Sequence, residues 1–247
     1  MSLELLIHNI GYILSAIMVV ITFIFVYVKD HRPLANKTLL LLFICTFGYV
    51  VSHVIGVNVN DPILSRNILL GNIFTIFFAP LFTHTVFALL GKLKEQKIAL
   101  IVIYTGSVLL TAVSLIFPDS LFLPSVPKMY FPNYYEAGVL YPAIIAWAIF
   151  VTTYCLSQML LAYRGAEPIL KNRLRYLFTA FLVAYALGST AWYLVFDIQI
   201  DPLPSIFFVV SFIIPFTYAV FKYDLMDIRI IAKQASVYSL EIGRAHV

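Results

Sequence analysis

Charged side chains are scarce in this sequence, and none lies inside its long apolar stretches. Asp, Glu, Lys and Arg make up 11% of the 247 residues, whereas 62% are hydrophobic. Soluble globular domains carry about 25% charged residues. The composition therefore excludes a soluble fold, and we predict an integral membrane protein.

Missing groups also exclude several functions. Ion pathways and proton relays are built from ionisable groups inside the membrane, so a pump or coupled transporter lacks its usual machinery here. The seventh apolar stretch has no lysine, which excludes a retinal Schiff base. The third stretch lacks the Asp-Arg-Tyr type of motif of G-protein-coupled receptors, and no Walker loop, HExxH or GxSxG motif occurs. We assign no catalytic residue.

Cysteine and histidine are few as well. Cys45 and Cys155 both lie inside apolar stretches, so a disulfide framework is not expected. His8 and His53 are placed to share a depth near the outer side, and His84 lies deeper. A structural or catalytic metal needs three or four ligands, so we predict no metal site and no cofactor. We interpret these histidines as hydrogen-bonded within a bundle.

Seven apolar stretches are long enough to cross a hydrocarbon core of about 30 Å at about 1.5 Å per residue. They are continuously apolar rather than alternating, which favours helices over barrel strands. We predict an all-α, polytopic membrane bundle over residues 1–221. Its seven helices are expected at approximately Leu5–Val28, Thr38–Val57, Ile68–Leu90, Ile98–Phe117, Val139–Tyr163, Tyr176–Phe196 and Ser205–Phe221.

The basic residues predict the orientation, because Lys and Arg are retained on the cytoplasmic side of short loops. Fourteen of the 16 lie in alternate connecting segments and the tail; only Arg66 and Lys128 lie on the other side. The N-terminus is therefore predicted outside and the C-terminus in the cytoplasm. The expected location is the cell inner (plasma) membrane, with the lipid bilayer as a partner and no nucleic acid.

The longest external loop, 118–138, is rich in proline and aromatic residues. We interpret it as an interfacial cap, with Tyr130, Phe131, Tyr134 and Tyr135 at the level of the lipid headgroups. The alternative is a lid over an outward-facing pocket. Such a pocket would be lined by Thr75, Ser189 and the four residues that we take as candidate ligand-binding residues: His53, Asn72, Tyr141 and Trp192.

Two features of the last helices bear on packing and signalling. Ala180, Ala184 and Gly188 form a stripe of small residues that allows another helix to approach closely. Pro215 removes a backbone hydrogen bond, which produces a static kink or a hinge just before the exit. The residues that we predict to transmit a signal are Pro215, Tyr223, Asp224, Asp227 and Arg229.

The exit from the membrane, residues 218–229 (YAVFKYDLMDIR), resembles the end of the seven-transmembrane sensor region of bacterial histidine kinases. Residues 136–141 (EAGVLY) and 173–177 (RLRYL) agree with it. The resemblance implies a membrane input domain that responds to an unknown small ligand or membrane stimulus, in a sensor histidine kinase that works as a homodimer. No phosphoacceptor histidine box or ATP-binding domain is present, so this chain is not expected to be an enzyme.

Two other function classes stay open at this point. One is a small transporter or channel for an uncharged solute, in which inverted repeats and broken helices would be expected. The other is a structural or assembly protein that uses the small-residue stripe. Identification of the downstream reading frame would separate the three.

The end of the chain has its own organisation. Residues 222–240 are predicted to be a cytoplasmic juxtamembrane exit segment. Residues 241–247 are interpreted as a non-native tail, because Ile-Gly-Arg-Ala-His-Val resembles one reading frame of a common sequencing adapter. The native chain is then expected to continue from about Leu240.

Overall fold

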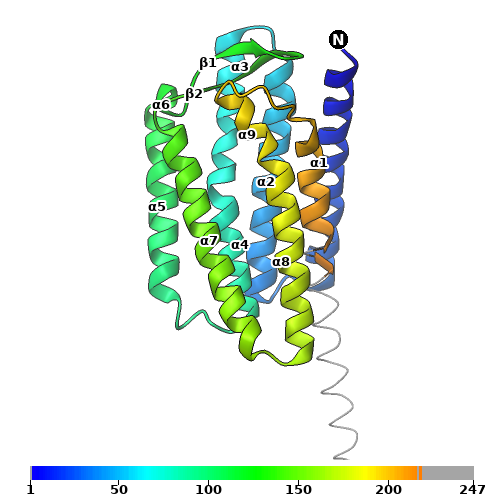
Figure 1. Ribbon diagram of the computed structural model, residues 1–247, viewed down its shortest axis with the longest axis vertical. Helices are drawn as coiled ribbons and strands as arrows, with labels where there is room; N and C mark the ends of the chain where they lie inside the picture. Colours follow the sequence, from blue (N-terminus) through cyan, green and yellow to red (C-terminus); the bar gives the residue numbers. More distant parts are fainter. Residues whose placement is uncertain (1, 216, 219–247) are drawn as a thin grey trace, which may run out of the picture.

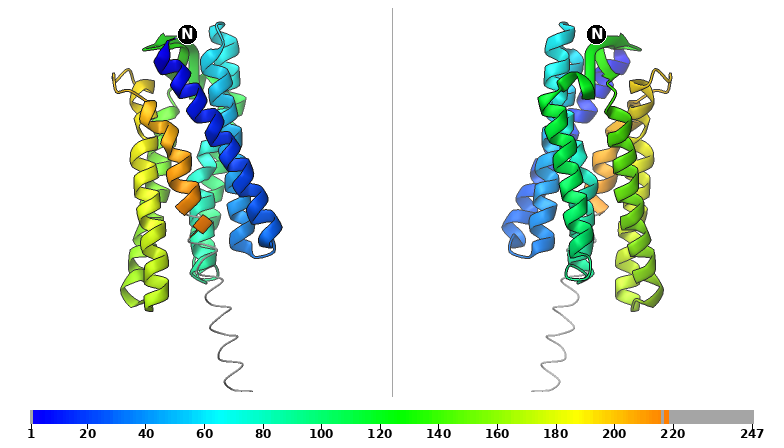
Figure 2. Two further views of the ribbon diagram at one scale, coloured as in Figure 1. Left: turned by 90° about the vertical axis from the view of Figure 1, so that its right-hand side faces the viewer. Right: turned by 90° about the vertical axis from the view of Figure 1, so that its left-hand side faces the viewer.

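The computed structural model describes residues 2–215, 217 and 218. Within them, six helices are long and apolar enough to cross a membrane, and Leu203–Pro215 is a shorter apolar helix, called here the last helix. They lie side by side along the long axis of the molecule (Figures 1 and 2). The six are α1 (Leu3–Asp30), α2 (Leu34–Asn58), α3–η1–α4 (Pro62–Leu69, Leu70–Phe77, Phe78–Leu89), α5 (Lys97–Ile116), α7 (Tyr141–Gly165) and α8–α9 (Pro168–Gly188, Thr190–Val195).

As far as the structure describes them, all seven predicted spans correspond to helices, but two of the helices begin six or more residues earlier than predicted. The third begins at Pro62, because Asp61 accepts a hydrogen bond from the backbone N–H of Leu64 and proline favours the first helical position. The sixth begins at Pro168, two turns before the predicted start at Tyr176. Helical hydrogen bonds also persist in water, so the apolar stretch marks the membrane crossing rather than the helix ends.

The connection between α5 and α7, predicted to be external, holds a β-hairpin that the all-α prediction missed. After the short helix α6 (Pro118–Leu121), strand β1 (Phe122–Lys128) pairs antiparallel with β2 (Phe131–Ala137). Three prolines interrupt the strands, at 124, 127 and 132, and the pairing has two irregularities. Because proline cannot donate to a strand ladder, the sequence carries little of the usual strand pattern.

The interpretation of the aromatic loop residues as a headgroup belt is wrong for three of the four. Phe131, Tyr134 and Tyr135 are at most 3% exposed and belong to an outer core cluster that also includes residues of α2, α3 and α9. The hairpin satisfies much of its own backbone hydrogen bonding, so its aromatic face is free to pack onto the bundle. Tyr130 alone remains partly exposed.

The orientation yields a labelling prediction. The N-terminus and the hairpin lie at one end of the bundle, and the α4–α5 and α7–α8 connections lie at the other (Figure 1). Lys128 is buried, so the exposed turn residue Met129 is the better reporter for the hairpin.

In a background without Cys45 and Cys155, we expect Met129→Cys to react with a membrane-impermeant maleimide in intact cells. Lys94 is also exposed, and Lys94→Cys should react only after lysis, because its loop belongs to the basic set that is predicted to be cytoplasmic. Labelling at 94 but not at 129 in intact cells would reverse the orientation.

A candidate ligand-binding cavity under the hairpin

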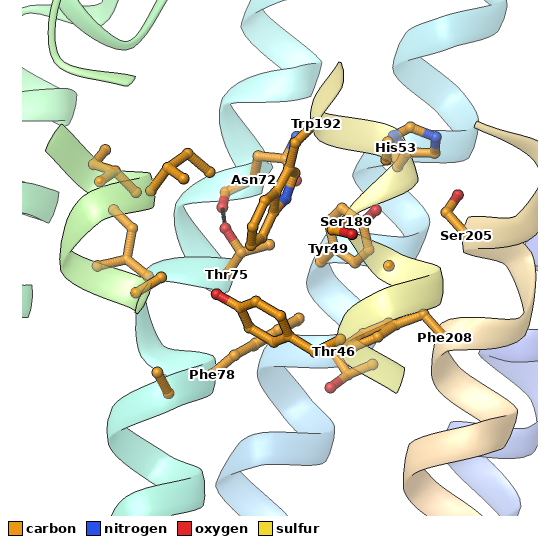
Figure 3. Close-up of a pocket in the computed structure, with 18 of the residues that line it drawn as sticks. Thr46, Tyr49, His53, Asn72, Thr75, Phe78, Ser189, Trp192, Ser205 and Phe208 are labelled. Atoms are coloured by element: carbon orange, nitrogen blue, oxygen red, sulfur yellow. Dashed lines mark hydrogen bonds between the residues drawn. The ribbon is translucent and has the colours of Figure 1, made fainter. Parts of the chain in front are cut away.

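A cavity of about 130 Å³ lies beneath the hairpin, between α2, η1, α4, α7, α8, α9 and the last helix (Figure 3). That is roughly ten times the space needed for one water molecule on the same measure. Cavities of this kind, mostly apolar with a few polar groups, are typical of small-molecule sites.

All six residues that the sequence analysis placed in an outward-facing pocket line this one cavity. His53 comes from α2, Asn72 and Thr75 from η1, Tyr141 from α7, and Ser189 and Trp192 from the junction of α8 and α9. A 3₁₀-helix repeats every three residues, so η1 turns both its polar side chains to the cavity. Their assignment to ligand binding stays a hypothesis.

A histidine pair lies at the hairpin end of the cavity. The Nε2 atoms of His53 and His8 are 3.2 Å apart, and Nδ1 of His53 is 2.6 Å from the hydroxyl of Tyr135. Both histidines are at most 1% exposed. The prediction that these two share a depth and bond within the bundle is confirmed. His84 also bonds within the bundle, to Tyr104.

A group of hydrogen-bonded hydroxyls lies beside this pair, since the rings of Tyr12 and His53 stack with their centroids 4.5 Å apart. The hydroxyl of Tyr12 lies 3.0 Å from that of Tyr49 and 2.9 Å from Oγ of Ser205, so α1, α2 and η2 (Leu203–Phe207) share one polar network. Sequence reasoning missed this network. One signal was present: His8 and Tyr12, and likewise Tyr49 and His53, are four residues apart and so lie on one helix face.

Phenylalanines close the opposite end of the cavity. The ring centroids of Phe82 and Phe181 are 4.4 Å apart, those of Phe82 and Phe212 are 5.8 Å apart, and those of Phe78 and Phe208 are 5.9 Å apart. These contacts join α4 to α8 and to the last helix. The five residues are called here the phenylalanine floor: Phe78, Phe82, Phe181, Phe208 and Phe212.

Lys128 fastens the hairpin over the cavity. Its Nζ lies 2.8 Å from carboxylate oxygens of both Glu136 and Asp197, and it donates to the carbonyl oxygens of Leu194 and Val195 at 3.1 and 3.3 Å. The two carbonyls end α9, where a positive charge is favourable. Sequence reasoning counted Lys128 only as an external charge, whereas it holds β1, β2 and α9 together.

Further hydrogen bonds join the hairpin to its surroundings. Asn133 donates to the carbonyl oxygens of Val59 and Asn60, and Tyr134 donates to that of Ala191. Tyr130 donates to Asp201 at 2.9 Å, and burial together with this carboxylate raises the pKa of Tyr130 well above its usual value. Tyr130 therefore keeps its proton, and this contact, at neutral pH.

The described lining of the cavity carries no charged side chain, since none of its residues is Asp, Glu, Lys or Arg. In the part of the chain that the structure describes, no group of three or more His, Cys, Asp or Glu is placed to hold a metal ion. The cavity therefore offers apolar contact and a few hydrogen bonds.

Comparison with known proteins gives the class of the chain. A family model described as the N-terminal 7TM region of histidine kinase matches residues 12–229. The chain belongs to this family. No curated protein and no solved structure matches the chain. The 7TM region is thus a multi-pass membrane protein, as the resemblance implied, and no catalytic kinase domain is identified in this chain.

Most of the predicted signal-transmission residues lie outside the described part of the 7TM region. Pro215 ends the last helix as described and is partly buried. Tyr223, Asp224, Asp227 and Arg229 lie outside the described residues, as do the exit segment 222–240 and the tail 241–247. The role of all five residues in signalling stays a prediction.

Proposed function

We propose that this 7TM region is the membrane input domain of a sensor histidine kinase, and that it binds a small ligand in the cavity under the hairpin. The signal then passes through α8 and the last helix to the output domain. One observation carries the proposal: the phenylalanine floor lines the cavity and also joins α4 to both of those helices.

The relay needs only a small bias between two packings. A ligand on the floor contacts rings from α4, α8 and the last helix at once, so it stabilises whichever arrangement of these helices fits it better. A ligand shifts such an equilibrium by its difference in affinity for the two states. Small helix shifts at an interface are an established way to carry this change. Membership of the histidine kinase family favours this function over a solute transporter or channel.

Filling the cavity should change the output of the full-length kinase that carries this region. Ala148 on α7 lines the cavity, whereas Ala146, two residues earlier, is exposed on the same helix. We expect Ala148→Phe to change basal autophosphorylation in membrane vesicles by about fivefold or more, because the added ring occupies the space of the ligand against the floor.

Ala146→Phe is the matched control, since it adds the same ring to the outside of α7. We expect it to leave autophosphorylation within about twofold of the unaltered protein. Immunoblots should show equal membrane levels for the compared proteins. Equal output from both variants and the unaltered kinase would contradict a signalling role for the cavity.

A further inference from the structure

We infer that the cavity binds a compact, uncharged molecule the size of one six-membered ring with a single hydroxyl or amide group. The inference rests on the proposed function, in which the cavity is the ligand site. It names the chemical class of the ligand from the size, the charge and the hydrogen-bonding groups of the lining.

The size of the cavity limits the ligand. An apolar cavity of about 150 Å³ holds one benzene molecule. The present cavity, at about 130 Å³, is similar in size, so it takes about one ring with at most a small polar substituent. A long acyl chain or a sugar chain exceeds this space. The floor suits a ring, because aromatic and alicyclic groups pack well on phenylalanine edges and faces.

The lining disfavours a charged ligand. No Asp, Glu, Lys or Arg occurs among the described residues that line the cavity, so a buried charge would find no counter-ion. A cation can instead rest on an open aromatic face. However, Phe82 stacks on Phe181 with 29° between ring planes, and Phe78 stacks on Phe208 with 12°, so these faces already contact one another.

The lining hydroxyls favour a ligand that donates a hydrogen bond. Thr46, Thr75 and Ser189 donate to carbonyl oxygens of their own helices at 2.8, 2.7 and 3.0 Å. Each hydroxyl has one proton and two lone pairs, so these oxygens can still accept. An anionic head, which only accepts, does not match them.

One lining group donates in return. The indole N–H of Trp192 makes no hydrogen bond to any residue that the structure describes, and Trp192 lines the cavity (Figure 3). An oxygen atom of the ligand could accept a hydrogen bond from this N–H group. A hydroxyl or a primary amide both donates and accepts, so one such group matches Ser189 and Trp192 together. The ring of the ligand then points to the phenylalanine floor.

The two tryptophans of the chain make the site observable. Trp147 donates to Ser107 on α5 and does not line the cavity, whereas Trp192 does. The purified Trp147→Phe chain in lipid discs is titrated with benzyl alcohol, toluene, benzylammonium and benzoate, and the emission of Trp192 is recorded. These probes share one ring and differ in charge and hydrogen bonding.

We expect a saturable change with benzyl alcohol, at a Kd at least about tenfold below those of benzoate and benzylammonium. The change should vanish when Ala148→Phe is added and persist with Ala146→Phe, which controls for partition of the probe into lipid. Ser189→Ala, which keeps the cavity open, should weaken benzyl alcohol binding about fivefold and leave toluene unchanged.

Two results would overturn the inference. In the first, benzoate or benzylammonium saturates at an equal or lower concentration than benzyl alcohol. In the second, benzyl alcohol gives no saturable change, or gives one that Ala148→Phe does not remove. Neither result bears on the proposed function, because that is decided by the autophosphorylation of the Ala148→Phe kinase.

Discussion

Replacing Gly138 with alanine is expected to destabilise the 7TM region by about 3 kcal/mol. A Cβ atom at this position would lie 2.5 Å from the carbonyl oxygen of Asp119 and would also collide with that of Ser120. Both are backbone atoms. They are held in place because Gly138 N–H donates to Leu121 and Leu140 N–H donates to Ser120, at 2.8 and 2.7 Å. The hairpin end cannot move aside without losing these bonds.

Gly165→Ala is the matched control. No atom lies within 4 Å of a Cβ built at Gly165, which is the last residue of α7. Alanine is a better helix former than glycine, so this change should be neutral or stabilise by up to about 1 kcal/mol. Unfolding of both variants by denaturant in micelles, followed by tryptophan fluorescence, gives the comparison. If the Gly138→Ala and Gly165→Ala variants have the same free energy of unfolding, the crowding around position 138 does not destabilise the fold and the prediction is wrong.

Lys128→Met is expected to cost about 2 kcal/mol and to loosen the attachment of the hairpin to α9, where the hydrogen bond from Tyr134 to Ala191 remains. The lysine side chain is 4% exposed and contacts two carboxylates and two helix-end carbonyls. Breaking a buried ion pair costs about 3–5 kcal/mol. We reduce this value because Asp197 is 66% and Glu136 is 29% exposed, so water solvates the carboxylates left behind.

Arg66→Met provides the comparison, because Arg66 also pairs with a carboxylate at the hairpin end. That carboxylate, Asp119, lies 3.2 Å away and is 69% exposed. Its loss should cost less than about 1 kcal/mol. Limited proteolysis should show faster cleavage within 122–137 for Lys128→Met only. If both variants lose the same stability and are cleaved alike, Lys128 does not fasten the hairpin.

Much of the fold follows from local composition. A bilayer core of about 30 Å demands about 20 apolar residues in succession for each helix, and no distant residue is needed to recognise such a run. The seven stretches therefore give the helices and the membrane location. The exit sequence 218–229 and the segment EAGVLY gave the family. The crowding around Gly138 now gives a physical reason for the glycine in that segment.

The candidate site was predictable in part. His53, Asn72, Tyr141 and Trp192 were chosen as polar or aromatic side chains near the outer helix ends, and depth alone brings such residues to one level. The depth of a residue in the membrane does not determine whether its side chain faces the interior of the bundle or the lipid. The tight turn of η1 and the junction of α8 and α9 decided that, and they turn Asn72 and Trp192 to the cavity.

Only the tertiary structure decided the rest, because it depends on contacts between residues that are far apart in sequence. Tyr12 bonds to Ser205 across 193 positions, and Lys128 reaches Leu194 across 66. No local pattern reports such pairs, and three prolines hide the hairpin that covers the cavity. The sequence by itself determined a bundle of membrane helices from the histidine kinase family. The packing of those helices determined a cavity whose described lining carries no charged side chain, because side-chain direction follows from helix rotation and contact rather than from hydropathy.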